Sequence, residues 1–296
     1  MTKKEIYQYE IELEKKWRKT KWLIPAISIV TSMGFLFAIW TCLHYYEKGH
    51  WWTVFIAGLF AHSFFIVALH DASHKSITRH QADRWIMNIA AGFLLLPFFG
   101  EAFRNSHLIH HSNSNSEYDP LWHEDKQYLF KKSRLFYVLC ELIPLVFTTY
   151  LTLRSRNKRE SASKKIKGPG INYWFVLMAS GVSLLIIFYL KPSLWFCIGM
   201  IFMLNFFAKL RHWSEHLGTD SSGTNNTFWY PLGMGVGNHD THHYAAFISW
   251  PVLAIGLLKR KKNSNPFYAF YGVLFKKDFI HYTEEGNLID KNRLSS

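Results

Sequence analysis

Ten of the 16 histidines fall into four clusters whose spacing suits metal binding. Residues three or four apart on a helix lie on one face, so each cluster can direct its imidazoles toward one ion. A single such pair is weak evidence, because paired histidines also occur on solvated surfaces. Four clusters in one chain predict that they bind metal together. They are His70 and His74; His107, His110 and His111; His212 and His216; and His239, His242 and His243.

The donor set limits the kind of metal centre. Ten neutral imidazoles exceed what one ion can bind, which favours two ions, and imidazole suits iron, zinc, copper and nickel. A structural zinc site would close with four ligands and usually use cysteine, whereas the three cysteines lie far apart in apolar segments. Carboxylates beside the clusters could orient the rings by accepting their second N–H, or could be solvated charges. The candidates are Asp71, Glu101, Glu117, Asp119, Glu215 and Asp240.

The sequence predicts that membrane-spanning helices carry these residues. Hydrophobic residues make up 49% of the chain and aromatic residues 18%, which indicates an all-α integral membrane protein and excludes a disordered chain. A span takes about 20 apolar residues. Four segments qualify, and they pair into two hairpins: 23–43 with 51–69, and 173–190 with 194–210. We expect interfacial or re-entrant helices at 85–99 and 135–153, while 244–258 remains ambiguous.

The net charge of +13 indicates how the chain is oriented. Basic segments favour the cytosolic side of a membrane. In the four-span topology the basic segments share one side, and the two external turns hold only Lys48 and Lys191. The N-terminus, the C-terminus and all four histidine clusters are therefore predicted to be cytosolic. The charge also favours contact with membrane lipid over binding to nucleic acid.

Two polar residues lie inside predicted spans. Asn205 precedes His212 by seven residues and His62 precedes His70 by eight, so each lies deeper in the membrane than a histidine cluster. Intramembrane polar groups usually face a bundle interior or a cavity. Both residues are candidates for lining a substrate tunnel, although an interhelical hydrogen bond is the more common role.

The histidine pattern resembles that of the membrane fatty acid desaturase and hydroxylase superfamily, whose signature is HxxxH, then HxxHH, then a late HxxHH on four spans. His70 and His74 match the first histidine box, the cluster from His107 to His111 matches the second, and the cluster from His239 to His243 matches the third. Asp119-Pro120 resembles the stretch that follows the second box, and Asn238 precedes the third as in many members. His212 and His216 resemble an additional ligand cluster. The resemblance covers about residues 51–258.

This resemblance implies a non-haem diiron enzyme that uses O2, most simply an acyl-chain desaturase. Its cofactors would be two iron ions held by the ten clustered histidines. We expect no fused cytochrome domain, so that electrons would come from a separate donor of the ferredoxin, rubredoxin or cytochrome type. The chain would divide into a cytosolic amphipathic segment at 1–22, a four-span catalytic domain with a cytosolic cap at 23–258, and a basic cytosolic tail at 259–296.

Other functions stay open. Many lipid desaturases continue the third box with Leu-Phe-Pro, whereas this chain has Tyr244-Ala245-Ala246, which leaves the substrate subtype unassigned. A hydroxylase or ketolase acting on an alkane, a carotenoid or another hydrophobe is the first alternative. A non-catalytic metal transporter or sensor is the second, but transporters place their ligands near the bilayer midplane, whereas these histidines gather just beyond the ends of the predicted spans.

Overall fold

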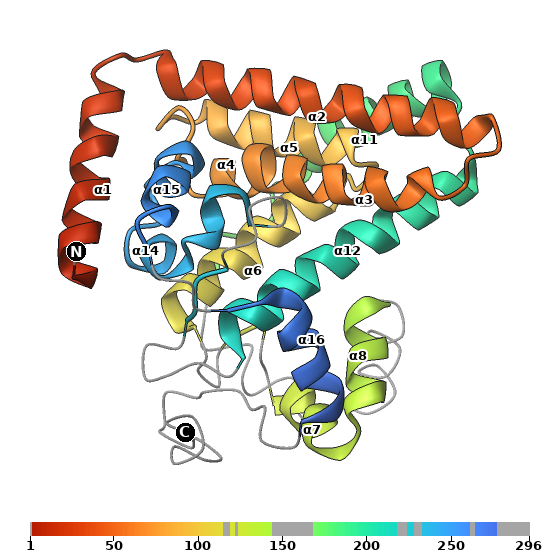
Figure 1. The fold of residues 1–296 in the computed structure, drawn as a ribbon. Helices are drawn as coiled ribbons and strands as arrows, with labels where there is room; N and C mark the ends of the chain where they lie inside the picture. Colours follow the sequence, from red (N-terminus) through yellow and green to blue (C-terminus); the bar gives the residue numbers. More distant parts are fainter. Residues whose placement is uncertain are drawn as a thin grey trace.

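The computed structural model describes residues 2–114, 119–121, 124–143, 168–217, 224–227, 233–260 and 264–276. Helices are the regular structure of these residues, together with an isolated bridge between Thr227 and Ser264. Figure 1 shows long helices across one side of the molecule and short helices gathered beside them. This arrangement agrees with the all-α fold expected from the sequence.

Four helices are long and apolar enough to cross a membrane. They are α2 (Leu23–Glu47), a continuous helix from Thr53 to Ser73, α11 (Tyr173–Leu190) and α12 (Leu194–His216). The second of these consists of α3 (Thr53–Phe64), the π-helix η1 (Phe65–His70) and α4 (Asp71–Ser73). This helix and α12 both extend past the predicted span ends, so that their last turns carry histidines.

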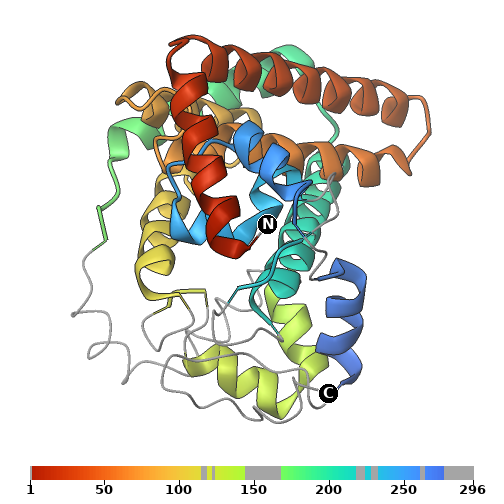
Figure 2. The ribbon, with the colours of Figure 1, turned by 60° about the vertical axis from the view of Figure 1, so that its left-hand side comes forward.

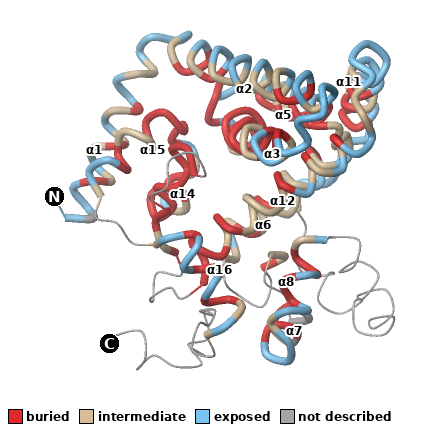
Figure 3. Tube along the Cα trace, turned by 45° about the vertical axis from the view of Figure 1, so that its right-hand side comes forward, coloured by how far each residue is buried: buried red, intermediate tan, exposed pale blue. Residues whose placement is uncertain are grey.

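The four long helices differ in how far the protein covers them. In the most apolar window of each, 72% of the residues from the Thr53–Ser73 helix are buried but only 17% of those from α2. Figure 3 shows the exposed faces along α2 and α11 and the buried residues along α3. In a bilayer the exposed apolar faces would contact lipid, which makes the Thr53–Ser73 helix the central element of the bundle.

The packing of α3 against its neighbours requires a small residue. α3 lies between α2 and α12, and Gly58 faces Met203 of α12 so closely that a Cβ at Gly58 would collide with the Cβ of Met203. Small residues let membrane helices approach in this way. Although α11 and α12 are joined by a short turn, α11 packs against α5 (Ala82–Phe93), whereas α12 packs against α3.

Short helices complete the side of the molecule that carries the histidines. The predicted interfacial segment at 85–99 corresponds to α5 and the start of α6 (Phe99–Asn113). In the segment predicted at 135–153, α8 (Arg134–Leu142) follows α7 (Glu124–Lys132), and residues 144–153 lie outside the described residues. The ambiguous segment at 244–258 contains α15 (Trp250–Leu257), which is largely buried and too short to span a bilayer.

The last described element, α16 (Pro266–Phe275), lies within the segment 259–296 that was expected to be a basic tail. It is an apolar helix that packs against α12 and α8. Phe270 of α16 stacks on Trp213 with ring centroids 5.8 Å apart. Its ten residues are too few for a span, so the hydropathy criterion that located the four long helices could not detect it.

Candidate metal centre

The first histidine box lies at a change of helix type. The α-helical turns of α3 give way to η1, whose last residue is His70. A π-helical turn inserts extra backbone into each turn and changes the direction of the residues that follow, and such turns are frequent at functional sites. After α4, the chain leaves the helix at His74. The two imidazoles of the box end with their ring centroids 5.3 Å apart.

The other clusters come from three more helices. α6 carries His107, His110 and His111, the last turns of α12 carry His212 and His216, and the six-residue helix α14 (His239–Tyr244) carries the third box. The 3-10 helix η2 (Met234–Gly237) precedes α14 and packs closely on α15. A Cβ at Gly235 would collide with the carbonyl oxygen of Trp250, so a glycine is needed at this contact.

Five imidazoles from three boxes form the first group. Their ligand atoms all lie within 4.8 Å of one another. The Nε2 atom of His107 lies 2.8 Å from that of His74 and 3.2 Å from that of His111. Two nitrogens bound to one ion at about 2.1 Å and at a right angle would be about 3 Å apart, so these spacings suit a shared metal ion. The group consists of His70, His74, His107, His111 and His242.

A second group lies beside the first. It contains His110, His216 and His243, again with ligand atoms within 4.8 Å of one another. The Nε2 atom of His239 lies 2.9 Å from that of His216. The groups meet where the rings of His111 and His243 stack, with their centroids 4.3 Å apart. This proximity allows two ions in neighbouring positions, as a dimetal centre requires.

The structure thus brings nine of the ten predicted ligands into close mutual contact. His212 lies at the edge of the second group, with its ring centroid 4.9 Å from that of His216 and 6.4 Å from that of His110. The sequence pattern alone could not separate His212 from the others, because the i, i+4 spacing places both residues of its cluster on one face.

Burial keeps these imidazoles in the form that binds metal. Burial, together with the neighbouring His110, lowers the pKa of His74 to about 3. The pKa values of His107 and His242 are likewise held well below the usual value, first by burial and then by adjacent histidines. The rings are therefore neutral at physiological pH, as metal ligation requires.

Several buried ring nitrogens also have no hydrogen-bond partner among the residues that the structure describes. Both nitrogens of His242 and the Nε2 atoms of His70 and His243 are in this state. A buried polar atom without a partner costs about 1–3 kcal/mol, and coordination to a metal would remove that cost. The neutral donors, their spacing and these partnerless nitrogens fit a pair of metal ions.

Three of the predicted carboxylates contact ligand histidines. Asp119 accepts a hydrogen bond from Nδ1 of His110 at 2.9 Å. The carboxylate of Glu215 lies 3.3 Å from Nδ1 of His239, and that of Asp71 lies 3.5 Å from Nδ1 of its neighbour His70. Of these three contacts, that of Asp119 is a hydrogen bond, and such a partner fixes the orientation of an imidazole and raises its basicity. Nδ1 of His239 and Nδ1 of His70 have no hydrogen-bond partner among the described residues.

The other predicted carboxylates have different contacts. Glu101 accepts hydrogen bonds from Arg84, Asn88 and the backbone N–H of Asn172, and thereby joins α5, α6 and the start of α11. Asp240 accepts hydrogen bonds from Thr224 at 2.7 Å and from Asn226 at 3.2 Å, which fastens α14 to the segment 224–227. Glu117 lies outside the described residues.

The two tunnel candidates occupy distinct environments. The side-chain amide of Asn205 donates to the carbonyl oxygens of Glu141 and Leu142, at 2.9 and 2.8 Å, and so ties α12 to the end of α8. His62 is fully buried in α3, with its ring 6.1 Å from that of Phe65. The contacts of Asn205 are of the interhelical kind that polar residues in spans commonly make.

Two buried glutamates beside the third box were not identified from the sequence. Glu10 and Glu14 lie in α1 (Lys3–Arg18), within the predicted amphipathic segment, and are 0% and 1% exposed. Their spacing of four residues from each other and from Ile6, also buried, places all three on one face. Because carboxylates are seldom buried, the residue type gave no indication that these two glutamates are buried. Their position on the same helix face as Ile6 was the only local signal of it.

Comparison with known proteins identifies the class. The fatty acid desaturase family model matches residues 48–262, which includes all four histidine clusters. The chain therefore belongs to the fatty acid desaturase family, and the resemblance based on the histidine boxes is confirmed. No curated protein and no solved structure matches the chain significantly. The family, the four apolar helices and the histidine groups define a desaturase-like membrane oxidoreductase.

Proposed function

We propose that the protein is an O2-dependent diiron oxidoreductase that introduces a double bond into a fatty acyl chain. The observation that carries the proposal is the pair of adjacent imidazole groups. Two bound irons would supply the reduction of O2 and the removal of two vicinal hydrogens from an unactivated chain, which side chains alone cannot do. Electrons would come from a separate donor of the ferredoxin, rubredoxin or cytochrome type.

The chain's own residues supply binding and orientation. In the first group, His74, His107 and His242 would hold one ion, together with His70 and His111. In the second group, His110, His216 and His243 would hold the other ion, and His239 lies within ligand distance of it. Most of these rings are buried, which limits the access of water to the reacting centre. The apolar spans would receive the acyl chain from the membrane.

We also propose that the centre and both termini are cytosolic. The support is the charge distribution along the chain, in which basic residues accumulate on the side of the span ends that carry histidines. His70 and His216 lie in the last turns of their spans. A position at the membrane boundary favours an enzyme that acts on lipid over a transporter that binds ions at the midplane.

The test is turnover by the iron-loaded protein in lipid bilayers, with a reduced ferredoxin as donor and with acyl lipids of defined composition. Oxygen uptake together with new double bonds in mass spectra of the lipids would support desaturation. New hydroxyl groups would assign a hydroxylase or ketolase. Metal movement across the bilayer without oxygen uptake would assign a transporter.

A histidine variant tests the centre itself. His110→Ala is expected to abolish turnover and to lower bound iron, because it removes a ligand from the second group. His44→Ala is the matched control, since His44 is exposed in α2 among aromatic residues far from both groups. Retention of full iron content and turnover in His110→Ala would exclude His110 as a ligand.

A further inference from the structure

The N-terminal helix α1 contacts the third histidine box through two buried carboxylates. α1 lies outside the family-matched residues 48–262, and Figure 2 shows it crossing in front of α14 and α15. Its buried face contains Glu10 and Glu14. We refer to these two residues as the acidic clasp.

Glu10 forms hydrogen bonds with one residue that precedes His239 in the sequence and one that follows it. Its carboxylate accepts a hydrogen bond from the side-chain amide of Asn238, which precedes the third box, and one of 2.5 Å from the hydroxyl of Thr241 within the box. Arg260 lies 3.5 Å from the same carboxylate. The approach is close, since a Cβ at Gly256 of α15 would collide with the Glu10 side chain.

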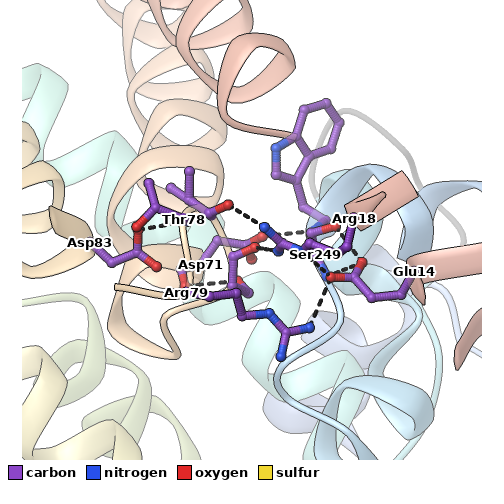
Figure 4. Close-up of polar contacts among 10 residues, drawn as sticks. Glu14, Arg18, Asp71, Thr78, Arg79, Asp83 and Ser249 are labelled. Carbon is purple, nitrogen blue, oxygen red and sulfur yellow. Dashed lines mark hydrogen bonds and ion pairs between the residues drawn. The ribbon is translucent and has the colours of Figure 1, made fainter. Parts of the chain in front are cut away.

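Glu14 joins the segments that follow the first and third boxes. It accepts hydrogen bonds from the backbone N–H and the hydroxyl of Ser249, at 3.2 and 2.7 Å. On its other side it accepts one from Arg79 at 3.0 Å and one from Arg18 at 2.8 Å. Arg18 in turn donates to the carbonyl oxygens of Ser76 and Ile77, beyond the first box. Figure 4 shows Glu14 between Ser249 and the two arginines.

The first box has a second link to the same region. The carboxylate of Asp71 accepts a hydrogen bond of 2.7 Å from the backbone N–H of Trp250. The first box, the third box and α1 therefore share one buried polar network. Within it, Glu10 holds α14 through the side chains of Asn238 and Thr241, and Glu14 and Asp71 hold the start of α15.

We propose that the acidic clasp is a positioning device for the metal centre, in which Glu10 sets the orientation of the third histidine box and Glu14 holds that box in register with the first. This inference rests on the proposed metal-binding function. Both imidazole groups receive ligands from the third box, namely His242 in the first and His243 in the second. Loosening α14 should therefore affect both ions, although the hydrogen bonds of the two glutamates within the described residues go to other residues than the histidines.

The experiment measures metal binding by the full-length chain in detergent. Co²⁺ is the probe, because its visible absorption reports ligand number and geometry. Asn238 and Thr241 donate to different oxygens of the Glu10 carboxylate, and in Glu10→Gln one of these two oxygens is replaced by an NH2 group, which cannot accept. We expect about 10- to 100-fold weaker Co²⁺ binding and an altered absorption band, with the metal-free protein still folded. Glu12→Gln is the matched control, because Glu12 is exposed on the same helix.

A rescue variant separates positioning from general destabilisation. Combining Glu10→Gln with Asn238→Asp reverses the donor and acceptor of this hydrogen bond, and the glutamine oxygen can still accept from Thr241. Co²⁺ affinity and the absorption band should return toward those of the wild type. If Glu10→Gln does not fold, Thr241→Val removes the hydrogen bond that Thr241 donates to Glu10 and the one that it accepts from Arg260, with little change in shape. A smaller loss of affinity is expected.

The outcomes distinguish this inference from the proposed function. A wild-type protein that binds no Co²⁺ would overturn both. A wild-type protein that binds two ions while Glu10→Gln and Thr241→Val bind them with unchanged affinity and spectrum would overturn the positioning role alone. Weaker binding that follows a loss of thermal stability and is not restored by Asn238→Asp would also overturn it.

Discussion

The carboxylate of Asp119 accepts a hydrogen bond from Nδ1 of His110 at 2.9 Å, nine residues away along the chain. Both side chains are almost completely buried. Because Nδ1 is occupied by this bond, Nε2 of His110 is the nitrogen that can bind a metal. The stretch after the second box therefore contributes to the centre by fixing the orientation of one ligand.

Replacing Asp119 should weaken the second metal group. In Asp119→Asn the partner of His110 loses its charge, and the loss expected for such an outer partner is about 10- to 100-fold in metal affinity or activity. Titration of the metal-free protein with Fe²⁺ under anaerobic conditions measures it. Glu47→Gln, at an exposed carboxylate at the end of α2, is the control. Equal affinities in the two variants would show that Asp119 does not support the centre.

The contact between α3 and α12 predicts a second effect. In Gly58→Ala the added methyl group would meet the Cβ of Met203, and relieving such overpacking typically costs about 1–3 kcal/mol. The two helices carry His70 and His216 at their ends, so we expect lower thermal stability and reduced metal affinity together. Gly34→Ala is the control, since nothing lies within 4 Å of a Cβ there. A Gly58→Ala protein as stable as Gly34→Ala would contradict the close packing of the two spans.

The sequence predicts those parts of the centre that have a local signal. Hydropathy located the four long helices, and histidine spacing located the histidine clusters that the structure brings together, because both depend on residues that are near one another in the chain. The hydrogen bond between Glu10 and Thr241 joins residues 231 positions apart, and no local sequence pattern reveals such a pair. The division of the histidines into two groups likewise depends on how α6, α12 and α14 pack.

The type of a helix and the presence of short helices could not be predicted from the sequence either. The π-helical turn before His70 leaves no mark in a hydropathy profile, since its residues are as apolar as those of the α-helix before it. Glu101 was predicted to support a ligand histidine because it lies near the second box in the sequence. In the structure its carboxylate accepts hydrogen bonds from Arg84 and Asn88 instead. Proximity along the chain is therefore a poor guide to which carboxylates support a ligand.

The contacts of Asn205 lead to a third prediction. In Asn205→Leu the carbonyl oxygens of Glu141 and Leu142 lose a donor, and an unsatisfied buried group costs about 1–3 kcal/mol. We expect a lower unfolding temperature in detergent with an unchanged position of the double bond in the product. A shifted double bond at unchanged stability would instead place Asn205 in the substrate tunnel.

A buried ionic cluster on α7, α8 and α12 makes stability depend on pH. Glu141 forms ion pairs with Lys126, at 2.7 Å, and with Lys209. Burial opposes ionisation of Glu141, but the two lysines outweigh it and lower the pKa of the carboxyl group from its ordinary value of 4.5 to about 2. The ionised form therefore stabilises the fold fully above pH 4.5, and this contribution is lost as the pH falls toward 2.

Glu141→Gln tests this assignment. At neutral pH the variant removes the carboxylate that pairs with both lysines, and breaking a buried ion pair costs about 3–5 kcal/mol. The unfolding temperatures of wild type and variant should differ most above pH 4.5 and approach each other toward pH 2, because the wild-type carboxyl group is then protonated. Thermal unfolding of the metal-free proteins across this range measures the difference and keeps titration of bound-metal ligands out of the comparison. A difference that stays constant with pH would show that the charge of Glu141 does not stabilise the cluster.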